Sequence, residues 1–244
     1  MRRSEYAMAI KENAIHALCV SLDVIDPYLH FLYSIISQDE RERADRLIIA
    51  HRRRNFIASR GLLRIILSRY LICNPSQIRF CYNYYGKPYI VPIANREELS
   101  FNVSHSNSAV LYGLARGRTI GVDIEFVRRD INYEGIASAI FSEAEIRNLH
   151  SLPISLRPSG FYIAWTRREA YAKAIGTGMM SSNSSSESEL DKEIAFSREG
   201  MRNVPKWSLH DISPMPGYVG ALVVEGESQL VCCRQWHPEQ LLNL

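Results

Sequence analysis

The sequence lacks the features that mark membrane, secreted and disordered proteins. No apolar run approaches the ~20 residues of a membrane-spanning helix. The segment Met1–Arg3 is basic, but Glu5, Lys11 and Glu12 interrupt the apolar core that a signal peptide would need. Hydrophobic residues at 46% and charged residues at 23% are typical of a folded globular chain, not of a disordered or coiled-coil one. We therefore expect a cytoplasmic protein with no membrane partner and a loose N-terminal leader over residues 1–15.

Cysteine frameworks and common hydrolase motifs are also missing. The five cysteines are an odd number and no two are spaced as C-x-x-C, so neither a disulfide scaffold nor a cysteine-ligated zinc site is expected. The nucleophile motif G-x-S-x-G is absent. A net charge of +3 is too small to indicate a nucleic-acid-binding protein by itself.

What is present is an irregular order of helical and strand patterns, which predicts an α+β protein of 244 residues in one or two domains. Ser37 with Glu40, and Ser142 with Glu145, have the spacing of a capping box at a helix start. One helix is expected to begin at Ser37. Four further helices are expected, over Arg52–Leu71, Ile131–Ile140, Ser142–Leu149 and Gly160–Ile175. The expected strands are His16–Asp23, Ile78–Tyr84, Tyr89–Ile93, Leu99–Val103, Ala109–Ala115, Ile120–Phe126, Tyr218–Val224 and Gln229–Gln235. Polar loops are expected at Ser104–Ser108 and Ser181–Ser188.

Two segments share an outline of strand, short polar turn and strand. They are Ala109–Phe126 and Tyr218–Trp236, and each follows a helix-bearing stretch. Duplicated halves that meet near residues 118–120 would produce this similarity. Chance similarity of two hairpins explains it equally well.

One candidate for chemistry is the run Gly121–Glu125. Residues i and i+2 of a strand point to the same side, so Asp123 and Glu125 present two carboxylates on one face. Adjacent carboxylates repel unless a cation lies between them, and Mg²⁺ prefers such oxygen ligands. A solvent-facing strand surface would have the same pattern.

A second candidate is the helical run that ends at Lys173. Trp165, Glu169 and Lys173 are four residues apart and share one helical face. Glu169 would supply a third carboxylate and Lys173 a phosphate contact. The alternative is an ordinary surface Glu–Lys pair.

Other candidates could bind phosphate. His105 lies between Ser104 and Ser106, and imidazole and hydroxyl groups both donate hydrogen bonds to anionic oxygens. Clustered arginines favour phosphate recognition, although a solvated helix face has the same composition. The basic residues are Arg41, Arg43, Arg46, Arg52, Arg53, Arg54, Arg60 and Lys87.

The order of these motifs along the chain resembles that of the Sfp-type 4′-phosphopantetheinyl transferases, over about residues 37–224. The motifs are Gly86–Pro88, Phe101–Ser106, Gly121–Glu125, Phe141-Ser142-x-x-Glu145 and Trp165-x-x-Arg168-Glu169-Ala170-x-x-Lys173. The resemblance implies a pseudo-dimer of two similar α/β halves, residues 16–118 and 119–244, with the active site between them. It also implies a monomer that transfers the phosphopantetheine arm of coenzyme A to a serine of an apo acyl or peptidyl carrier protein, with release of adenosine 3′,5′-bisphosphate.

The same resemblance implies a role for each matching residue. Asp123, Glu125 and Glu169 match Mg²⁺ ligands, and Lys173 matches the lysine near the pyrophosphate. The implied coenzyme A contacts are Lys87, Ser104 and His105, with Arg43, Arg54 and Arg60 in the stretch that holds the nucleotide.

Glu145 matches a proposed base for the carrier serine, and the sequence leaves open whether Glu145 or a metal-bound water takes that proton. Arg168 replaces the usual lysine, and Ser181–Ser188 replaces a more apolar segment. The sequence also leaves open a non-catalytic module that binds coenzyme A or a carrier protein, and a basic nucleic-acid-binding domain built on Arg41–Arg69.

Overall fold

The computed structural model describes residues 8–11, 14–91, 98–176, 207–227, 230–237 and 239–240. Its longer helices are α1 (Leu29–Ile35), α2 (Gln38–Asp45), α3 (Ala50–Leu71), α4 (Tyr133–Ile140), α5 (Glu143–Ser151) and α6 (Arg157–Ile175). Its strands are β1 (Ala14–Ser21), β2 (Phe80–Tyr82), β3 (Pro88–Ile90), β4 (Leu99–Ser106), β5 (Ala109–Arg116), β6 (Ile120–Phe126), β7 (Trp207–Ile212), β8 (Tyr218–Glu225) and β9 (Leu230–Trp236). The predicted α+β class is confirmed.

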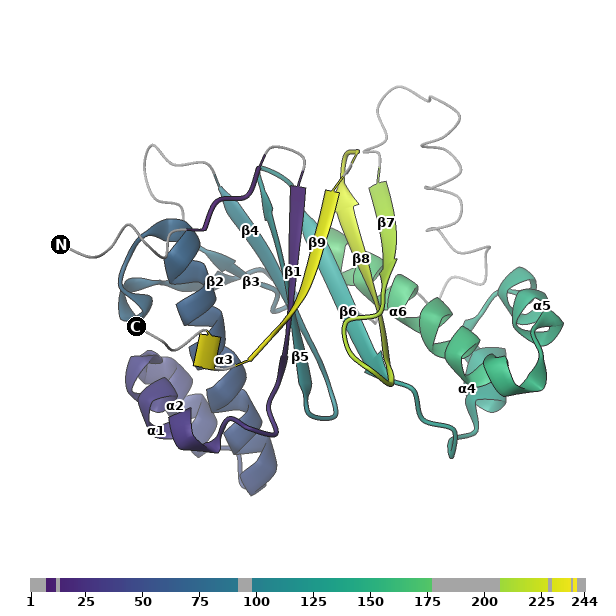
Figure 1. Ribbon diagram of the computed structural model, residues 1–244, viewed down its shortest axis with the longest axis horizontal. Coiled ribbons are helices and arrows are strands. Elements are labelled where there is room, and N and C mark those ends of the chain that lie inside the picture. Colours follow the sequence, from purple (N-terminus) through teal and green to yellow (C-terminus); the bar gives the residue numbers. More distant parts are fainter. Residues whose placement is uncertain are drawn as a thin grey trace.

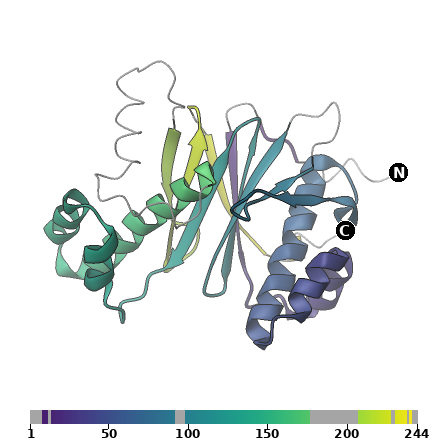
Figure 2. The same cartoon turned by 180° about the vertical axis from the view of Figure 1, so that it is seen from behind.

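Two sheets meet at the centre of the molecule, and helices cover their outer sides (Figures 1 and 2). One sheet has the strand order β4-β5-β1-β9 and the other β6-β8-β7, while β2 and β3 form a separate hairpin. Helix α3 packs on the first sheet and α6 on the second. The fold therefore has four layers, in the order helix, sheet, sheet, helix.

Small and branched side chains fill the space between the sheets. Cys19 of β1 and Leu111 of β5 are fully buried there against Val122 and Ile124 of β6. Val122 and Ile124 alternate with Asp123 and Glu125, so the polar residues of β6 point away from this core. The apolar contact between the sheets thus fixes which face of β6 presents its carboxylates.

Strand β4 lies along the free edge of β6 and joins it through side chains. Asn102 accepts a hydrogen bond from the backbone N–H of Val122 at 2.9 Å, and Ser106 accepts one from Phe126 at 3.0 Å. Ser104 donates to the carboxylate of Asp123 at 2.7 Å. Our prediction of a loop from Ser104 was wrong, because these alternating polar residues satisfy the edge of β6 and the strand continues to Ser106.

The two similar strand–turn–strand segments connect the sheets. β5 pairs with β1 and β4, whereas β6 pairs with β8, so the turn between β5 and β6 passes from one sheet to the other. β8 leads back in the same way to β9, which pairs in parallel with β1. Neither segment is a hairpin, and the last strand joins the sheet of the first.

Local signals located most other elements. Both capping boxes are present, at Ser37 with Glu40 and at Ser142 with Glu145. α6 begins at Arg157, three residues before the predicted start, and ends at Gly176 in the left-handed conformation. α1 and β7 were not predicted. The predicted loop at Ser181–Ser188 lies outside the described residues.

Helix α6 packs very closely on β6 at one glycine. A methyl group at Gly121 would overlap the backbone of Ala170 and Ala174 on α6. This close approach brings Glu169 and Lys173 alongside the carboxylates of β6.

We expect Gly121→Ala to push α6 away from β6 and to destabilise the fold by about 3 kcal/mol. Chemical denaturation measures the loss. Gly117→Ala is the matched control, since its side chain would enter open space and only its positive φ is unfavourable, at about 1 kcal/mol. Equal stability of the two variants would show that the contact at Gly121 is not tight.

Candidate active site

The centre of the site is a buried ion pair between β6 and α6. Asp123 is 3% exposed, and its Oδ1 accepts hydrogen bonds from Lys173 Nζ at 2.6 Å and from Ser104 Oγ at 2.7 Å. Lys173 also donates to Ser104 at 2.9 Å. The structure therefore brings together three residues that the sequence singled out from three separate segments. Burial raises the pKa of Asp123, and the ammonium group of Lys173 opposes that effect.

Two further carboxylates lie within electrostatic range of Asp123. Glu125 accepts a hydrogen bond from Ser106 at 2.6 Å, and Glu169 is one helical turn before Lys173 on α6. Burial raises the pKa of both glutamates, and Asp123 raises each further by repulsion. Among the described residues, no three acidic, histidine or cysteine side chains are gathered closely enough to hold one metal ion. The three form a loose acidic group.

His105 points to the other face of β4 from Ser104, toward α3. Desolvation lowers the pKa of His105 to about 4, and the charges of Lys173 and Arg60 contribute to the shift. The residue nevertheless keeps an exposed surface. A neutral imidazole near two cations is suited to donate a hydrogen bond to an anion.

Lys87 lies where the β2–β3 hairpin meets α6. Its ammonium group donates to the carbonyls of Ile120 and Ala174, both at 3.1 Å, and Asn83 donates to the carbonyl of Gly176 at 3.3 Å. Desolvation lowers the pKa of Lys87 to about 8. In the structure Lys87 thus holds the C-terminal end of α6, a role that the sequence did not suggest.

The three arginines expected near the nucleotide have different surroundings. Arg60 is half-enclosed by Phe56 and Phe80 and forms an ion pair with Glu40 at 3.3 Å. Exposed Arg43 stacks on Phe56 as well. Arg54 instead donates to Asp26 at 2.5 Å and to the carbonyl of Leu22 at 2.7 Å, contacts that tie α3 to the chain after β1.

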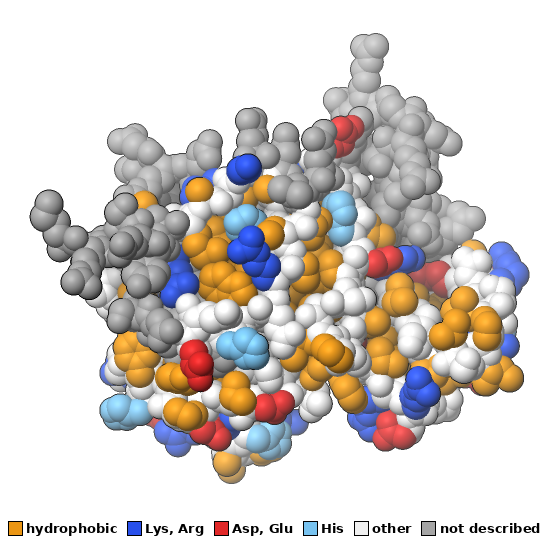
Figure 3. All heavy atoms as spheres, viewed as in Figure 1, with side chains coloured by type: hydrophobic (Ala, Val, Ile, Leu, Met, Phe, Trp, Pro, Cys, Tyr) orange, Lys and Arg blue, Asp and Glu red, His pale blue; other side chains and the backbone are white. Residues whose placement is uncertain are grey.

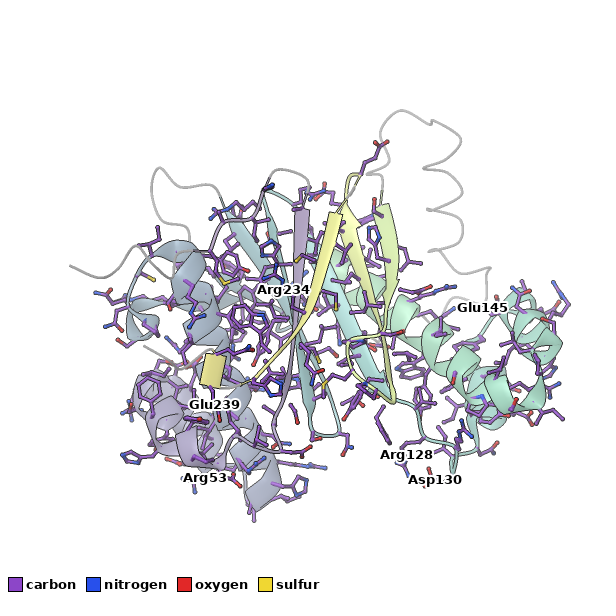
Figure 4. All side chains as sticks on the ribbon, in the orientation of Figure 1. Arg53, Arg128, Asp130, Glu145, Arg234 and Glu239 are labelled. Carbon is purple, nitrogen blue, oxygen red and sulfur yellow. The ribbon has the colours of Figure 1, made fainter. Side chains whose placement is uncertain are left out.

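Glu145 lies at the start of α5, where its side chain is engaged twice. It accepts from the backbone of Ser142 at 2.8 Å in the capping box and from Arg168 of α6 at 3.0 Å. Figure 4 labels Glu145 at the end of α5 nearest α6. Arg168 thus connects Glu145 to the helix that bears Glu169.

A pocket of about 740 Å³ opens beside Glu125. Apolar side chains of α4 and α6, including Ile136, Phe161 and Trp165, line one part of it, and polar and charged residues, Arg129 among them, line the rest. Figure 4 labels Arg128 and Asp130 on the same loop, and Figure 3 shows apolar side chains gathered over α4 and α5. An elongated, partly apolar group could therefore lie next to the acidic group.

An acidic group beside a lysine, a histidine and an arginine, on strands that join two α/β layers, is typical of enzymes that act on phosphorylated substrates. Two family models match the chain: "4′-phosphopantetheinyl transferase superfamily" over residues 119–223 and "4′-phosphopantetheinyl transferase, N-terminal" over residues 25–114. The chain belongs to the 4′-phosphopantetheinyl transferase family, as its resemblance to the Sfp type indicated.

Curated relatives of the chain support this family assignment. The chain is 33% identical to the 4′-phosphopantetheinyl transferase HetI of Nostoc sp. over 90% of this chain and 91% of HetI. It is 36% identical to a putative 4′-phosphopantetheinyl transferase of Synechocystis sp. over 63% of this chain and 62% of the relative. It is 31% identical to Sfp of Bacillus subtilis over 60% of this chain and 62% of Sfp. No described helix is long and apolar enough to cross a membrane.

The raised pKa of Glu125 predicts how the stability depends on pH. The folded state holds the proton more tightly than the unfolded chain, so ionisation of Glu125 destabilises the fold as the pH rises through its folded pKa. We expect Glu125→Gln to raise the melting temperature at about pH 8 and to have little effect at about pH 4, where the wild-type carboxyl is protonated. Thermal melts at both pH values measure the difference. Exposed Asp130→Asn is the control, and an equal rise at both pH values would contradict the prediction.

Proposed function

We propose that the protein transfers the 4′-phosphopantetheine arm of coenzyme A to a serine of an apo acyl or peptidyl carrier protein in a Mg²⁺-dependent reaction. The single observation that supports it best is buried Asp123, which is paired with Lys173 and lies within electrostatic range of Glu125 and Glu169. This arrangement combines oxygen ligands for a cation with a cation for a phosphate. The other product is adenosine 3′,5′-bisphosphate.

The donor types present suit Mg²⁺, although the three carboxylates lie too far apart in the structure to hold one ion together, so a bound ion would have to draw them closer. Oδ2 of Asp123 is buried and accepts no hydrogen bond from the described residues, so one ligand oxygen is available. Burial and mutual repulsion raise the pKa of Glu125 and Glu169, and a bound cation would relieve that repulsion. We propose these three carboxylates as the ligands. Bound Mg²⁺ would neutralise charge on the pyrophosphate as the leaving group departs.

Lysine and arginine side chains, together with the neutral imidazole of His105, would hold the phosphate oxygens. Lys173 stands beside Asp123, and His105 and Arg60 lie on the α3 side of β4. Together with Lys87 and Ser104 they would orient coenzyme A so that its pyrophosphate lies over the acidic group. Arg43 is exposed and could reach the nucleotide, while Arg54 would contribute by holding α3 in place.

In the transfer step the carrier serine Oγ bonds to the phosphorus of the phosphopantetheine. The bond from that phosphorus to the oxygen of the adenosine bisphosphate breaks, and the serine proton passes to a base. We propose Glu145 for this role, since its carboxylate approaches α6 through Arg168.

The pocket beside Glu125 would accept the pantetheine arm or the carrier segment around its serine. Its apolar part suits a partly apolar chain, and Arg128 and Arg129 suit an acidic carrier surface. Each proposed site residue comes from one chain, so we propose a monomer. We also propose a cytoplasmic location, where coenzyme A and a carrier protein would both be available.

The first experiment is the intact mass of an apo carrier protein after incubation with this protein, coenzyme A and Mg²⁺. A gain of one phosphopantetheine arm that a chelator abolishes is the expected result. Carrier binding without a mass gain, across acyl and peptidyl carriers, would instead indicate a non-catalytic binding module.

Asp123→Asn tests the centre of the site in the same assay. It removes the charge that pairs with Lys173 and a proposed metal ligand, so we expect turnover to fall by at least about 100-fold. Asp39→Asn is the control, because Asp39 is exposed on α2 and is not one of the proposed site residues. Near-normal turnover of Asp123→Asn would exclude Asp123 from the reaction.

Glu145→Gln tests the base. Loss of the proton acceptor should lower kcat by about 100-fold and leave the KM for coenzyme A within a few-fold of wild type. The amide oxygen of this variant can still accept the capping hydrogen bond, and Glu143→Gln is a control on the exposed face of α5. A kcat close to that of wild type would assign the proton to another acceptor.

A further inference from the structure

A buried charge cluster behind the proposed nucleotide contact was not explained by the sequence. Glu40 of α2 and Arg64 of α3 each have side chains that are 1% exposed, and the side chain of Arg60 is 12% exposed. Two arginines thus share one carboxylate in this cluster. One positive charge remains uncompensated among the described residues around it.

The two arginines are satisfied to very different degrees. Arg64 donates from Nε to Glu40 at 2.7 Å and from Nη1 to the carbonyls of Pro75 at 3.0 Å and Ile78 at 2.9 Å. Arg60 makes one long hydrogen bond, from Nη2 to the Tyr82 hydroxyl at 3.4 Å. Arg64 is therefore a structural residue, whereas the outer edge of Arg60 can bind another acceptor.

Glu40 holds the inner edge of Arg60. Its Oε1 is buried, accepts no hydrogen bond from the described residues and lies 3.3 Å from Arg60 Nε. Phe56 and Phe80 flank the guanidinium, with ring centres at 5.9 Å and 5.2 Å from its carbon. The carboxylate and the rings leave the guanidinium little freedom to turn.

The outer edge of Arg60 faces the region where phosphate contacts are proposed. Its charge acts on His105 of β4, and its hydrogen bond reaches Tyr82 of the β2–β3 hairpin. An oriented guanidinium loses less freedom when it binds a phosphate, and it presents a planar pair of donors.

We propose that Glu40 is a positioning residue that orients Arg60, so that the outer edge of Arg60 binds a phosphate group of coenzyme A. The inference rests on the proposed function and adds a residue that does not touch the substrate. Glu40 belongs to a helix-capping box, which by itself predicts only a structural role. The second oxygen of its carboxylate, directed at Arg60, distinguishes the two roles.

The test compares two variants that differ only at Glu40. Arg64→Met removes the structural arginine and keeps Glu40 for Arg60, and Glu40→Gln with Arg64→Met removes the buried charges together. We expect Arg64→Met to bind adenosine 3′,5′-bisphosphate with nearly wild-type affinity and the double variant to bind about tenfold more weakly by calorimetry. Equal affinities of the two variants would overturn the proposal.

A second comparison uses Arg60→Gln. If Glu40 acts through Arg60, adding the double substitution to Arg60→Gln changes the affinity by less than about twofold, whereas an independent role would weaken binding further. Should the double variant fail to fold in thermal melts, Glu40→Asp keeps the charge but shortens its reach. That variant should raise the KM for coenzyme A by about tenfold while kcat stays within about twofold, and an unchanged KM would overturn the proposal.

Binding of adenosine 3′,5′-bisphosphate to the wild-type protein distinguishes failure of this proposal from failure of the proposed function. If it binds no adenosine 3′,5′-bisphosphate, coenzyme A is the wrong substrate and the proposed function fails. If it binds and the variants at Glu40 bind equally well, only the positioning role fails.

Discussion

The structure depends on side chains of β4, which accept hydrogen bonds from the backbone N–H groups along the edge of β6. Asn102 and Ser106 accept hydrogen bonds from the backbone N–H groups of Val122 and Phe126. An edge strand inside the molecule would otherwise leave buried donors unpaired, at a cost of about 1–3 kcal/mol each. Side chains in place of a backbone ladder leave room for Lys173 and Ser104 to enter between the layers.

This arrangement gives Asp123 two roles. It accepts a hydrogen bond from Ser104 of the other sheet, and it is also the most buried carboxylate of the proposed site. Burial, with a smaller contribution from the charge of Asp123, raises the pKa values of Glu125 and Glu169, and carboxylates perturbed in this way are typical of functional sites. The well-packed core between the sheets, in which Val122 and Ile124 are fully buried, offsets that cost.

Local chemistry made much of the fold predictable. The capping box at Ser142 and the spacing of Glu169 and Lys173 depend on neighbours in the chain, and the structure contains both. The prediction of a loop at Ser104–Ser108 was wrong because its polar residues are typical of loops. Only their hydrogen bonds to β6, which the sequence does not show, explain why the strand continues to Ser106. The burial of Glu40 likewise depends on α3, and a capping pattern contains no sign of it.

The pairing of the first strand with the last has a consequence for synthesis. β9 completes the central sheet beside β1, so all the residues that separate these two strands in the sequence must be synthesised before that sheet can close. Until then β1 has an open edge, which is a site for mispairing.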